Sequence, residues 1–230
     1  MSTPRGPLAA ALFDMDGILI DSEPIHEASL RDICAARGVV YDTALHAGYV
    51  GRSDAFVFGD LCARHPALGR DIDALVAARH ARFMELVDRP LDPRPGVVAV
   101  LDALAASHVP MAVVSTSALA QIERIVANLG LRPYFAELVS CAMVPSPKPA
   151  PDVYLLAAER LSVQPSQTLV FEDSAPGVGA GVAAGAVTVA VPCPATQAHD
   201  LSAAHARFAS FEEFGGAELG ALIGRFFGAA

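Results

Sequence analysis

The chain has 230 residues and a formal net charge of −9. This acidic balance argues against binding to a nucleic-acid backbone, which requires a basic face. Hydrophobic residues make up 53% of the chain, which is ample for a buried core. No apolar run reaches the roughly 18 residues of a membrane span. These properties favour a globular protein of one or two domains.

The beginning of the sequence and its cysteines indicate a cytoplasmic protein. The apolar residues 8–13 are too few for a secretory signal, and they run directly into two carboxylates. The four cysteines lie far apart and form no Cys-x-x-Cys motif: Cys34, Cys62, Cys141 and Cys193. In the absence of an export signal, we expect reduced and mostly buried thiols.

Apolar runs typical of buried β-strands recur along the chain, and each is followed by a helical pattern. The runs cover residues 8–13, 110–114, 137–141, 168–171 and 187–191. Alternating strands and helices predict an α/β fold with a Rossmann-like parallel sheet that is covered on both faces. Ligands of such sheets bind beyond the carboxyl ends of the strands.

One long segment after the first strand interrupts this alternation. It shows no strand pattern, and its apolar spacing predicts three helices before a proline-rich link at residues 89–96. We therefore expect an α/β core of residues 1–21 and 93–230 and an inserted helical cap domain of residues 22–92. The cap is placed to act as a lid. The aromatic tail, residues 208–227, is expected to form a last packing helix.

Two carboxylates, Asp14 and Asp16, follow the first predicted strand. Residues i and i+2 of an extended segment point to the same side, so the pair should converge. Repulsion and lost solvation disfavour such a pair unless a cation or a proton offsets it, and Mg²⁺ with oxygen ligands would do so. The alternative is an ordinary Asp-Gly turn. A calcium loop does not fit, because residues 18–20 offer no side-chain oxygen.

Polar groups follow three further strands. Ser115 ends the second, Lys148 lies in a proline-rich loop after the third, and Glu172-Asp173 follows the fourth. Lys148 is the single lysine of the chain, and a compact ammonium in a rigid loop suggests a site. The alternatives are an exposed lysine and simple helix caps. Since the carboxyl ends of parallel strands share one edge, the groups together predict an acid-rich metal site suited to phosphoryl transfer.

These residues resemble the four ordered motifs of the haloacid dehalogenase superfamily, in the branch with a helical cap after the first motif. The motifs are Phe-Asp-Met-Asp-Gly at 13–17, Val114-Ser115, Lys148-Pro-Ala-Pro and Phe171-Glu172-Asp173-Ser174. The resemblance covers roughly residues 8–195. It implies a phosphatase in which Asp14 is the nucleophile that forms an aspartyl-phosphate and Asp16 is the general acid and base. It also implies that Ser115 binds the phosphoryl group and that Lys148 neutralises charge shared by Asp14 and the phosphate.

The resemblance further implies a magnesium site and a substrate-recognition region. Its metal ligands would be Asp14, the backbone carbonyl of Asp16 and Asp173, with Glu172 in support, directly or through water. In the cap, the main candidate for binding the organic part of the substrate is Arg52, and His26 is a weaker one. Thr116 and Ser117, which follow Ser115, are also expected to contribute to substrate binding.

Departures from the family's other members favour the phosphatase. Dehalogenases of the superfamily lack the second aspartate, and phosphonoacetaldehyde hydrolases need a cap lysine that this chain does not have. A β-phosphoglucomutase-like mutase is the alternative, although such mutases also use a cap lysine and a Gly-x-Ser-Arg loop, where this chain has Gly51-Arg52-Ser53. A non-catalytic phospho-ligand or nucleotide-binding module is more remote, because the glycines of residues 177–185 miss the Gly-x-Gly-x-x-Gly spacing.

The expected ligand is a small phosphorylated metabolite. Its organic part stays open among hexose phosphates, sugar-acid phosphates, glycerol phosphate and phosphoglycolate. No nucleic acid, membrane or obligate protein partner is expected.

Overall fold

The computed structural model describes residues 5–50, 52–214 and 216–228, and the chain divides into two compact units. Residues 1–21 and 91–230 form one unit, called the core below. Residues 22–90 form the other, called the cap. The second boundary lies inside the proline-rich link.

The core is built on a parallel six-stranded sheet with the strand order β3-β2-β1-β4-β5-β6. The strands are β1 Ala10–Phe13, β2 Met111–Ser115, β3 Glu137–Ser140, β4 Thr168–Glu172, β5 Val187–Ala190 and β6 Ala206–Arg207. Every residue of β1, β2, β4 and β5 is buried, as apolar runs in a covered parallel sheet should be. The first five strands lie where the sequence predicts them. The two residues of β6 carry no apolar run, so nothing in the sequence indicates that strand.

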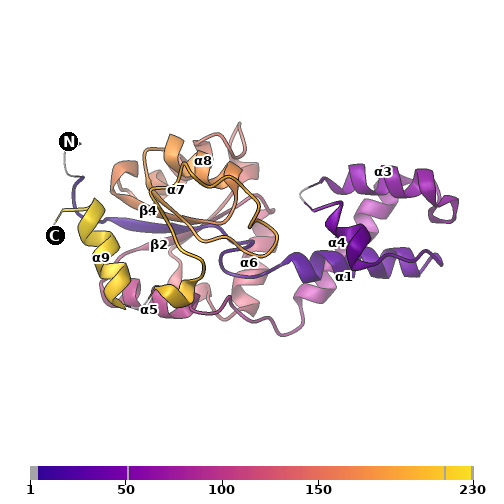
Figure 1. The fold of residues 1–230 in the computed structure, drawn as a ribbon, viewed down its shortest axis with the longest axis horizontal. Coiled ribbons are helices and arrows are strands. Elements are labelled where there is room, and N and C mark those ends of the chain that lie inside the picture. The colour runs from indigo at the N-terminus through magenta and orange to yellow at the C-terminus, as the bar shows by residue number, and fades with distance from the viewer. Residues whose placement is uncertain (1–4, 51, 215, 229–230) are drawn as a thin grey trace. The chain divides into compact units, whose positions relative to one another are not determined.

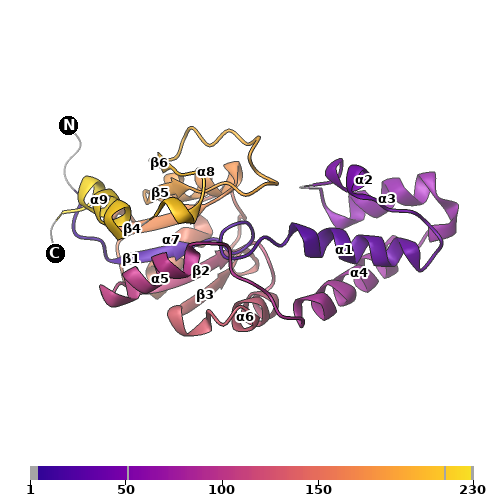
Figure 2. The ribbon, with the colours of Figure 1, turned by 60° about the horizontal axis from the view of Figure 1, so that its bottom comes forward.

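Helices cover both faces of the sheet (Figure 1, Figure 2). On one face lie α5 Val97–Ala106, α6 Leu119–Asn128 and α9 Gly216–Phe226, and on the other lie α7 Asp152–Arg160 and α8 Ala175–Ala183. The chain steps from β1 to β2 and β3 in one direction and then crosses back to β4 and β5 on the other side of β1. Right-handed crossovers in opposite directions place their helices on opposite faces.

The aromatic tail differs from the single helix that the sequence predicts. Only α9 and a one-turn 3-10 helix, Phe211–Glu213, are helical there. Phe208 and Phe214 lie outside both elements, and their rings contact each other at a centroid distance of 3.9 Å. Phe214 also contacts the ring of Phe171 in β4 at 5.8 Å, so contacts between aromatic rings help to hold this segment against the core.

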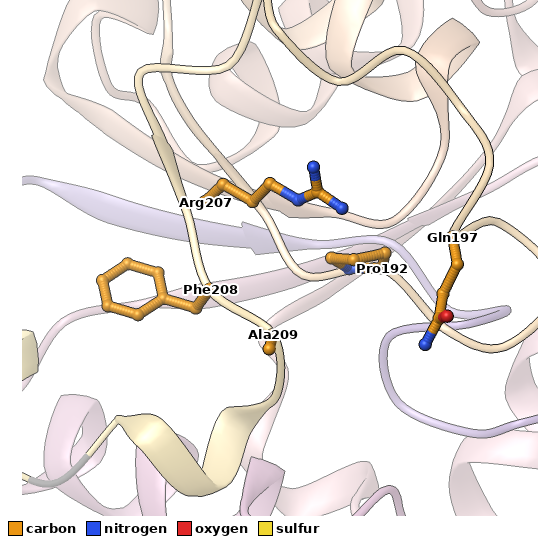
Figure 3. Close-up of a pocket in the computed structure, with 5 residues that line it drawn as sticks. All are labelled: Pro192, Gln197, Arg207, Phe208 and Ala209. Atoms are coloured by element: carbon orange, nitrogen blue, oxygen red, sulfur yellow. The ribbon is translucent and has the colours of Figure 1, made fainter.

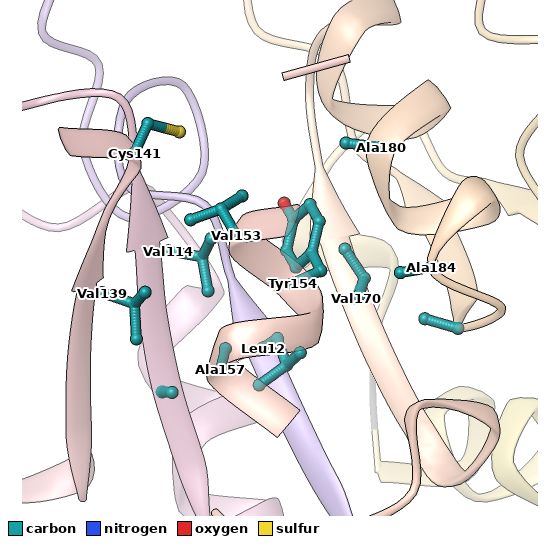
Figure 4. Packing of buried hydrophobic residues seen from close by; sticks show 12 residues of the cluster. Leu12, Val114, Val139, Cys141, Val153, Tyr154, Ala157, Val170, Ala180 and Ala184 are labelled. Carbon is teal, nitrogen blue, oxygen red and sulfur yellow. The ribbon is translucent and has the colours of Figure 1, made fainter. Parts of the chain in front are cut away.

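The pleat of the central strands decides which side chains face α7. Leu12 of β1 and Val170 of β4 belong to a buried cluster with Tyr154 of α7 (Figure 4). Phe13 and Phe171 follow them and point to the opposite face, where their rings stack at 4.8 Å. By the same alternation, the side chains of the next residues, Asp14 and Glu172, point to the face that α7 covers.

The cap contains four α-helices among its described residues. They are α1 Glu23–Ala35, α2 Thr43–Ala47, α3 Asp54–Arg64 and α4 Ile72–Val87. Their own core includes the buried residues Leu30, Cys34, Phe58, Leu61 and Leu75. The three longer helices match the predicted ones. The five-residue α2 is too short to show periodicity, although the Asp42 side chain caps it by accepting from the Leu45 amide at 2.8 Å.

Short 3-10 turns complete the described secondary structure at Pro66–Leu68, Arg132–Tyr134, Cys141–Met143 and Pro165–Gln167. Within the described ranges, no helix is both long and apolar enough to cross a membrane. All four cysteines are unpaired, and only Cys62 is not fully buried. This agrees with the expectation of free, mostly buried thiols.

Candidate active site

Asp14 and Glu172 lie side by side at the carboxyl ends of two neighbouring central strands. Phe13 pairs with Phe171 in the register of β1 and β4, and the Asp14 amide donates to the Phe171 carbonyl at 3.0 Å. Side chains alternate along a strand, so both carboxylates point to the α7 face. The chain leaves β1 toward β2 but leaves β4 toward β5. This is the topological switch point, where open parallel sheets bind ligands.

The ammonium group of Lys148 joins these two carboxylates. Its Nζ donates to Asp14 Oδ1 at 2.5 Å, to Glu172 Oε1 at 2.7 Å and to the Val114 carbonyl at 3.1 Å. Three acceptors thus use the three N–H groups of the ammonium. The Lys148 side chain is only 5% exposed. The alternative of a surface lysine is therefore wrong.

Burial and neighbouring charges shift the pKa values of this group. Burial by itself lowers the pKa of Lys148, but Asp14 and Glu172 raise it above its ordinary value, so the ammonium form is retained. Burial raises the pKa of Asp14 well above its usual range, against the opposing effect of Lys148. Burial and the Glu172 charge raise the pKa of Asp173 to about 6. One cation serves three buried carboxylates, and the excess negative charge favours binding of a second cation.

Donors occupy both carboxylate oxygens of Glu172. Oε1 accepts from Lys148 and from the Tyr154 hydroxyl at 2.6 Å, while Oε2 accepts from the Asp173 amide at 3.1 Å and the Ser174 hydroxyl at 3.2 Å. Gly177 leaves room for this carboxylate, because a Cβ there would lie 1.9 Å from it. Glu172 therefore orients Lys148 and the turn that follows β4. Ser174 also caps α8 by accepting from the Gly177 amide at 3.2 Å, as the helix-cap alternative predicts.

The Asp173 carboxylate is buried against the loop that follows β1. Gly17 in that loop has φ +82°, and a Cβ there would lie 2.2 Å from Asp173 Oδ2. Two groups donate to Oδ2: the Thr196 hydroxyl at 3.0 Å and the Cys193 thiol at 3.3 Å. Glycine is thus required at position 17 both for its backbone conformation and for the close approach of Asp173.

Asp16 and Ser115 meet at the edge of this cluster. Ser115 Oγ lies 3.5 Å from Asp16 Oδ2, and Asp16 Oδ1 is buried with no hydrogen-bond partner among the described residues. The same Ser115 oxygen accepts from the Ser117 amide at 3.1 Å. Ser115 does not cap α6, whose N-cap is Ala118, so the simple capping alternative is wrong for this serine.

Thr116 and Ser117 occupy the turn between β2 and α6. Thr116 is exposed, and the Ser117 carbonyl accepts from the Ser140 hydroxyl at 2.6 Å. This bond ties the turn to the end of β3. A role of either residue in substrate binding stays a prediction.

The four motifs and the parallel sheet point to one enzyme family, and comparison with known proteins decides it. Residues 8–185 match the model of haloacid dehalogenase-like hydrolases. The chain belongs to this family. It is 34% identical to fructose-1-phosphate phosphatase YqaB of Escherichia coli, over 77% of this chain and 93% of that protein. It is also 34% identical to hexitol phosphatase B of Escherichia coli, over 86% of this chain and 89% of that protein.

Solved structures agree with this assignment. CbbY from Rhodobacter sphaeroides, in complex with phosphate, superimposes with a TM-score of 0.76 at 27% identity and covers 90% of this chain and 96% of its own. A candidate β-phosphoglucomutase from Thermotoga maritima gives a TM-score of 0.78 at 29% identity, over 89% of this chain and 95% of its own. The predicted family and its α/β fold are therefore confirmed.

The acidic groups of this hydrolase fit a hard divalent cation. One carboxylate oxygen from each of Asp14, Glu172 and Asp173 lies within 4.8 Å of the others, and all three residues are buried. Carboxylate and carbonyl oxygens are the ligands that Mg²⁺ prefers. The unpartnered Asp16 Oδ1 adds a further acceptor without a donor. The donor set is therefore compatible with a magnesium site.

Several side chains at the site carry no signal in the sequence. Tyr154 has the ordinary spacing of a helix residue, while Cys193 and Thr196 lie in a loop without periodicity. The guanidinium of Arg94 donates to the carbonyl oxygens of Gly17, Val191 and Pro192. It thereby joins the loop after β1 to the loop after β5. Arg94 stands in the proline-rich segment that the sequence indicates only as a link.

The cap candidates Arg52 and His26 have different surroundings. Arg52 is exposed, and its guanidinium lies over the Phe56 ring at 5.2 Å from the centroid. His26 stacks on Phe83 at 4.6 Å, and its Nδ1 is hydrogen-bonded to the guanidinium of Arg79. Arg52 therefore has a surface position from which it could bind a ligand, whereas His26 is engaged within the cap.

Cavity size alone does not locate this site. A hollow of about 450 Å³ is lined by Pro192, Gln197, Arg207, Phe208 and Ala209 (Figure 3). It contains none of the predicted site residues. The convergent titratable groups at the strand ends mark the candidate active site.

Proposed function

We propose that this hydrolase is an Mg²⁺-dependent phosphatase that acts on a small phosphorylated carbohydrate through an aspartyl-phosphate on Asp14. The observation that carries the proposal is the buried contact of Asp14 with Lys148 at 2.5 Å, within the same cluster as Asp173. The E. coli relatives support the substrate class, because both are named as phosphatases of phosphorylated sugars or hexitols.

Mg²⁺ would be held by Asp14, the Asp16 carbonyl and Asp173, with Glu172 in support. When bound, it supplies positive charge that stabilises the phosphoryl oxygens and the nucleophile. Lys148 supplies the same kind of charge from the protein. Because Lys148 engages Asp14 Oδ1, the other oxygen of Asp14 is available for attack.

In the first step, an Asp14 carboxylate oxygen attacks phosphorus and the bond from phosphorus to the substrate oxygen breaks. Asp16 gives its proton to the leaving alkoxide, which departs as an alcohol. Ser115 hydrogen-bonds the transferred phosphoryl group. The product of this step is an acyl phosphate, the mixed anhydride of the Asp14 carboxylate and phosphate.

In the second step, water attacks the phosphorus of the aspartyl-phosphate. Asp16, now a carboxylate, takes a proton from that water, and the bond between Asp14 and phosphorus breaks. Inorganic phosphate leaves, and both aspartates return to their starting forms. One water is consumed for each ester that is hydrolysed. The unpartnered Asp16 Oδ1 supports this acid and base role.

We assign recognition of the organic part of the substrate to the cap, residues 22–90. Arg52 is its main candidate because it is exposed and ends a short turn before α3. His26, Thr116 and Ser117 are secondary candidates. A domain that recognises the organic group and acts as a lid would exclude water from the first step.

The decisive experiment is a turnover screen with the purified, chelator-treated protein. Its panel should hold hexose and hexitol phosphates, sugar-acid phosphates, glycerol phosphate and phosphoglycolate, each with and without Mg²⁺. We expect Mg²⁺-dependent release of inorganic phosphate, fastest for one phosphorylated carbohydrate. Full activity after chelation would contradict the metal assignment, and the absence of phosphate release from every ester would contradict the phosphatase.

A β-phosphoglucomutase-like activity is the second candidate, favoured by the similarity to the Thermotoga maritima structure. The lack of any lysine in the cap weighs against it. The screen separates the two activities when β-glucose 1-phosphate is included with a trace of the bisphosphate. Conversion to glucose 6-phosphate without phosphate release would establish the mutase. Binding of esters without either reaction would indicate a non-catalytic module.

A further inference from the structure

The loop that follows β5 contacts Asp173 through two side chains outside the four motifs. Thr196 Oγ1 lies 3.0 Å from Asp173 Oδ2, and Cys193 Sγ lies 3.3 Å from the same oxygen. Asp173 and Cys193 are 5% and 4% exposed, so solvent does not compete freely for these bonds. Both groups approach one oxygen of the carboxylate rather than sharing the two.

The other hydrogen bonds of Thr196 indicate that its hydroxyl is the donor in the bond with Asp173. A threonine hydroxyl has one proton to donate. Its oxygen already accepts from the Cys193 amide at 3.0 Å, and its proton has three acceptors within reach: Asp173 Oδ2, the Cys193 carbonyl and, at 3.4 Å, the weakly accepting Cys193 sulfur. Asp173 Oδ2 at 3.0 Å is nearer than the Cys193 carbonyl at 3.4 Å, and it is charged when ionised. The hydroxyl therefore donates to Asp173.

The neighbouring backbone holds this arrangement in place. Arg94 donates to the carbonyls of Val191 at 3.2 Å and Pro192 at 3.1 Å, which fixes the beginning of the loop. On the other side, Gly17 leaves only enough room for Asp173 Oδ2. Among the described residues, no donor forms a hydrogen bond with Asp173 Oδ1. One oxygen is thus enclosed by the protein, while the other has no protein donor.

We propose that Thr196, assisted by Cys193, is a positioning residue that holds Asp173 Oδ2 and presents Oδ1 to the divalent cation. This inference rests on the proposed function, in which Asp173 is a metal ligand. A ligand that is already oriented loses less conformational freedom when the ion binds. Partners of this kind commonly change metal affinity by about 10- to 100-fold when they are removed. The thiol of Cys193 is a weaker donor than the hydroxyl and should contribute less.

The test is a comparison of Thr196→Val with Thr196→Ser in the full chain. Valine keeps the branched shape and removes the hydroxyl, whereas serine keeps the hydroxyl and removes a methyl group. Isothermal titration of each metal-free protein with Mg²⁺ gives the dissociation constant without reference to turnover. We expect Thr196→Val to raise this constant by about tenfold or more and Thr196→Ser to stay within about threefold of the unmodified protein. Cys193→Ala should lie between the two.

Activity and unfolding provide two further readouts. In Thr196→Val, the Mg²⁺ concentration for half-maximal activity should rise by a larger factor than kcat falls at saturating Mg²⁺. Unchanged Mg²⁺ affinity in Thr196→Val, with or without a lower thermal midpoint in chelator, would overturn the proposal and leave a structural role. Equal weakening by valine and serine would also overturn it, because the hydroxyl would then be irrelevant. Thr196→Ala replaces Thr196→Val in the same comparison if the valine variant does not fold.

The unmodified protein separates this inference from the proposed function. If it binds no Mg²⁺ and shows no Mg²⁺-dependent phosphatase activity, the proposed function fails and this inference fails with it. If it binds Mg²⁺ and Thr196→Val binds Mg²⁺ equally well, only the positioning role fails.

Discussion

Both units of this hydrolase bury charged side chains, but they treat the charge differently. In the core, Asp14, Glu172 and Asp173 share the single cation Lys148. Burial raises the pKa values of Asp14 and Asp173, which means that the metal-free fold disfavours their ionised forms. The cluster holds three carboxyl groups but only one cation among its own residues.

In the cap, the buried side chains Arg79 and His46 each contact a partly exposed carboxylate, although burial still lowers the pKa of Arg79. Arg79 binds Asp54 at 3.1 Å, and His46 donates from Nε2 to Glu23 at 2.7 Å while its Nδ1 lies 3.0 Å from the Tyr41 hydroxyl. The hydrogen bond from His46 lowers the pKa of Glu23, against the opposing effect of burial. Here the fold favours the ionised carboxylate.

The difference is the one expected between a cluster suited to binding a ligand and one that supports structure. Carboxylates with matched partners stabilise the fold when they are charged, and their removal should cost stability. Carboxylates that outnumber the cations around them are suited to binding an added cation, and their removal should cost function instead. Substitutions in the two units can test this distinction directly.

The largest effect is expected from Asp14→Asn in the core, which removes the proposed nucleophile. Phosphate release should fall by about 10⁴-fold or more. The thermal midpoint of the metal-free protein should hold or rise, because one of several repelling carboxylates becomes neutral. The matched change in the cap, Asp54→Asn, should lower the free energy of unfolding by about 1–3 kcal/mol, because buried Arg79 loses its charged partner. A near-normal rate in Asp14→Asn would remove that residue from the chemistry.

Lys148→Arg tests whether the core needs a compact ammonium. A planar guanidinium cannot place three donors on Asp14, Glu172 and the Val114 carbonyl within the space of one ammonium. We expect kcat/KM to fall by about tenfold or more, since a loss of about 1.4 kcal/mol in transition-state stabilisation is already tenfold. The control is the opposite replacement, Arg132→Lys, which also keeps the positive charge. Arg132 is partly exposed and pairs with Glu123 at 3.0 Å, so this change should not alter the rate. An equal, small effect of both changes would show that Lys148 contributes only its charge.

The sequence predicts most of this fold because its signals are local. Four of the five predicted strands are buried throughout, so their apolar runs are uninterrupted. The alternation of the pleat also explains why Asp14 and Glu172 converge once β1 and β4 are neighbours. Neither signal predicts β6, because that strand has only two residues. Neither predicts the start of the tail, where aromatic contacts rather than helical spacing order the chain.

The site is predictable only as far as its motifs extend. Residues at strand ends can be read from the sequence, since the topology brings those ends together. Thr196, Cys193 and Arg94 cannot be found in this way, because they lie in loops and act through hydrogen bonds to partners far along the chain. The three partners of Arg94, the Gly17, Val191 and Pro192 carbonyls, are backbone groups that every residue has. Which carbonyls accept from Arg94 therefore depends on how the chain folds and not on the residue types at those positions.

A smaller effect is expected from Arg52→Ala, which removes an exposed guanidinium of the cap without touching its paired charges. If Arg52 recognises the organic group, KM for the preferred phosphorylated carbohydrate should rise severalfold, while turnover of a small aryl phosphate should hardly change. Arg70→Ala, another exposed cap arginine, is the control and should affect neither substrate. Equal losses on both substrates would assign Arg52 to structure or chemistry, and no loss on either would leave it as a solvated side chain.

The smallest effect is expected from Glu23→Gln, which tests whether the cap cluster is structural. The pKa of Glu23 is lowered in the folded chain, so the unfolded chain binds the proton more readily over the window between the two values. The stabilisation is therefore present above the ordinary carboxyl pKa and is lost as the pH falls through the lowered one. Because the Glu23 side chain is 32% exposed, we expect Glu23→Gln to lose about 1 kcal/mol or less of stability at pH 7.

Amide hydrogen exchange in α1 and α2 at neutral and acidic pH would measure this loss of stability. The exchange rates of the unmodified protein and of Glu23→Gln should differ at neutral pH and become equal in acid. Phosphate release at neutral pH should be the same in both proteins. A difference that persists undiminished in acid would mean that the carboxylate charge is not what Glu23 contributes, and the contrast between neutralised cap charges and the unneutralised core would lose its support.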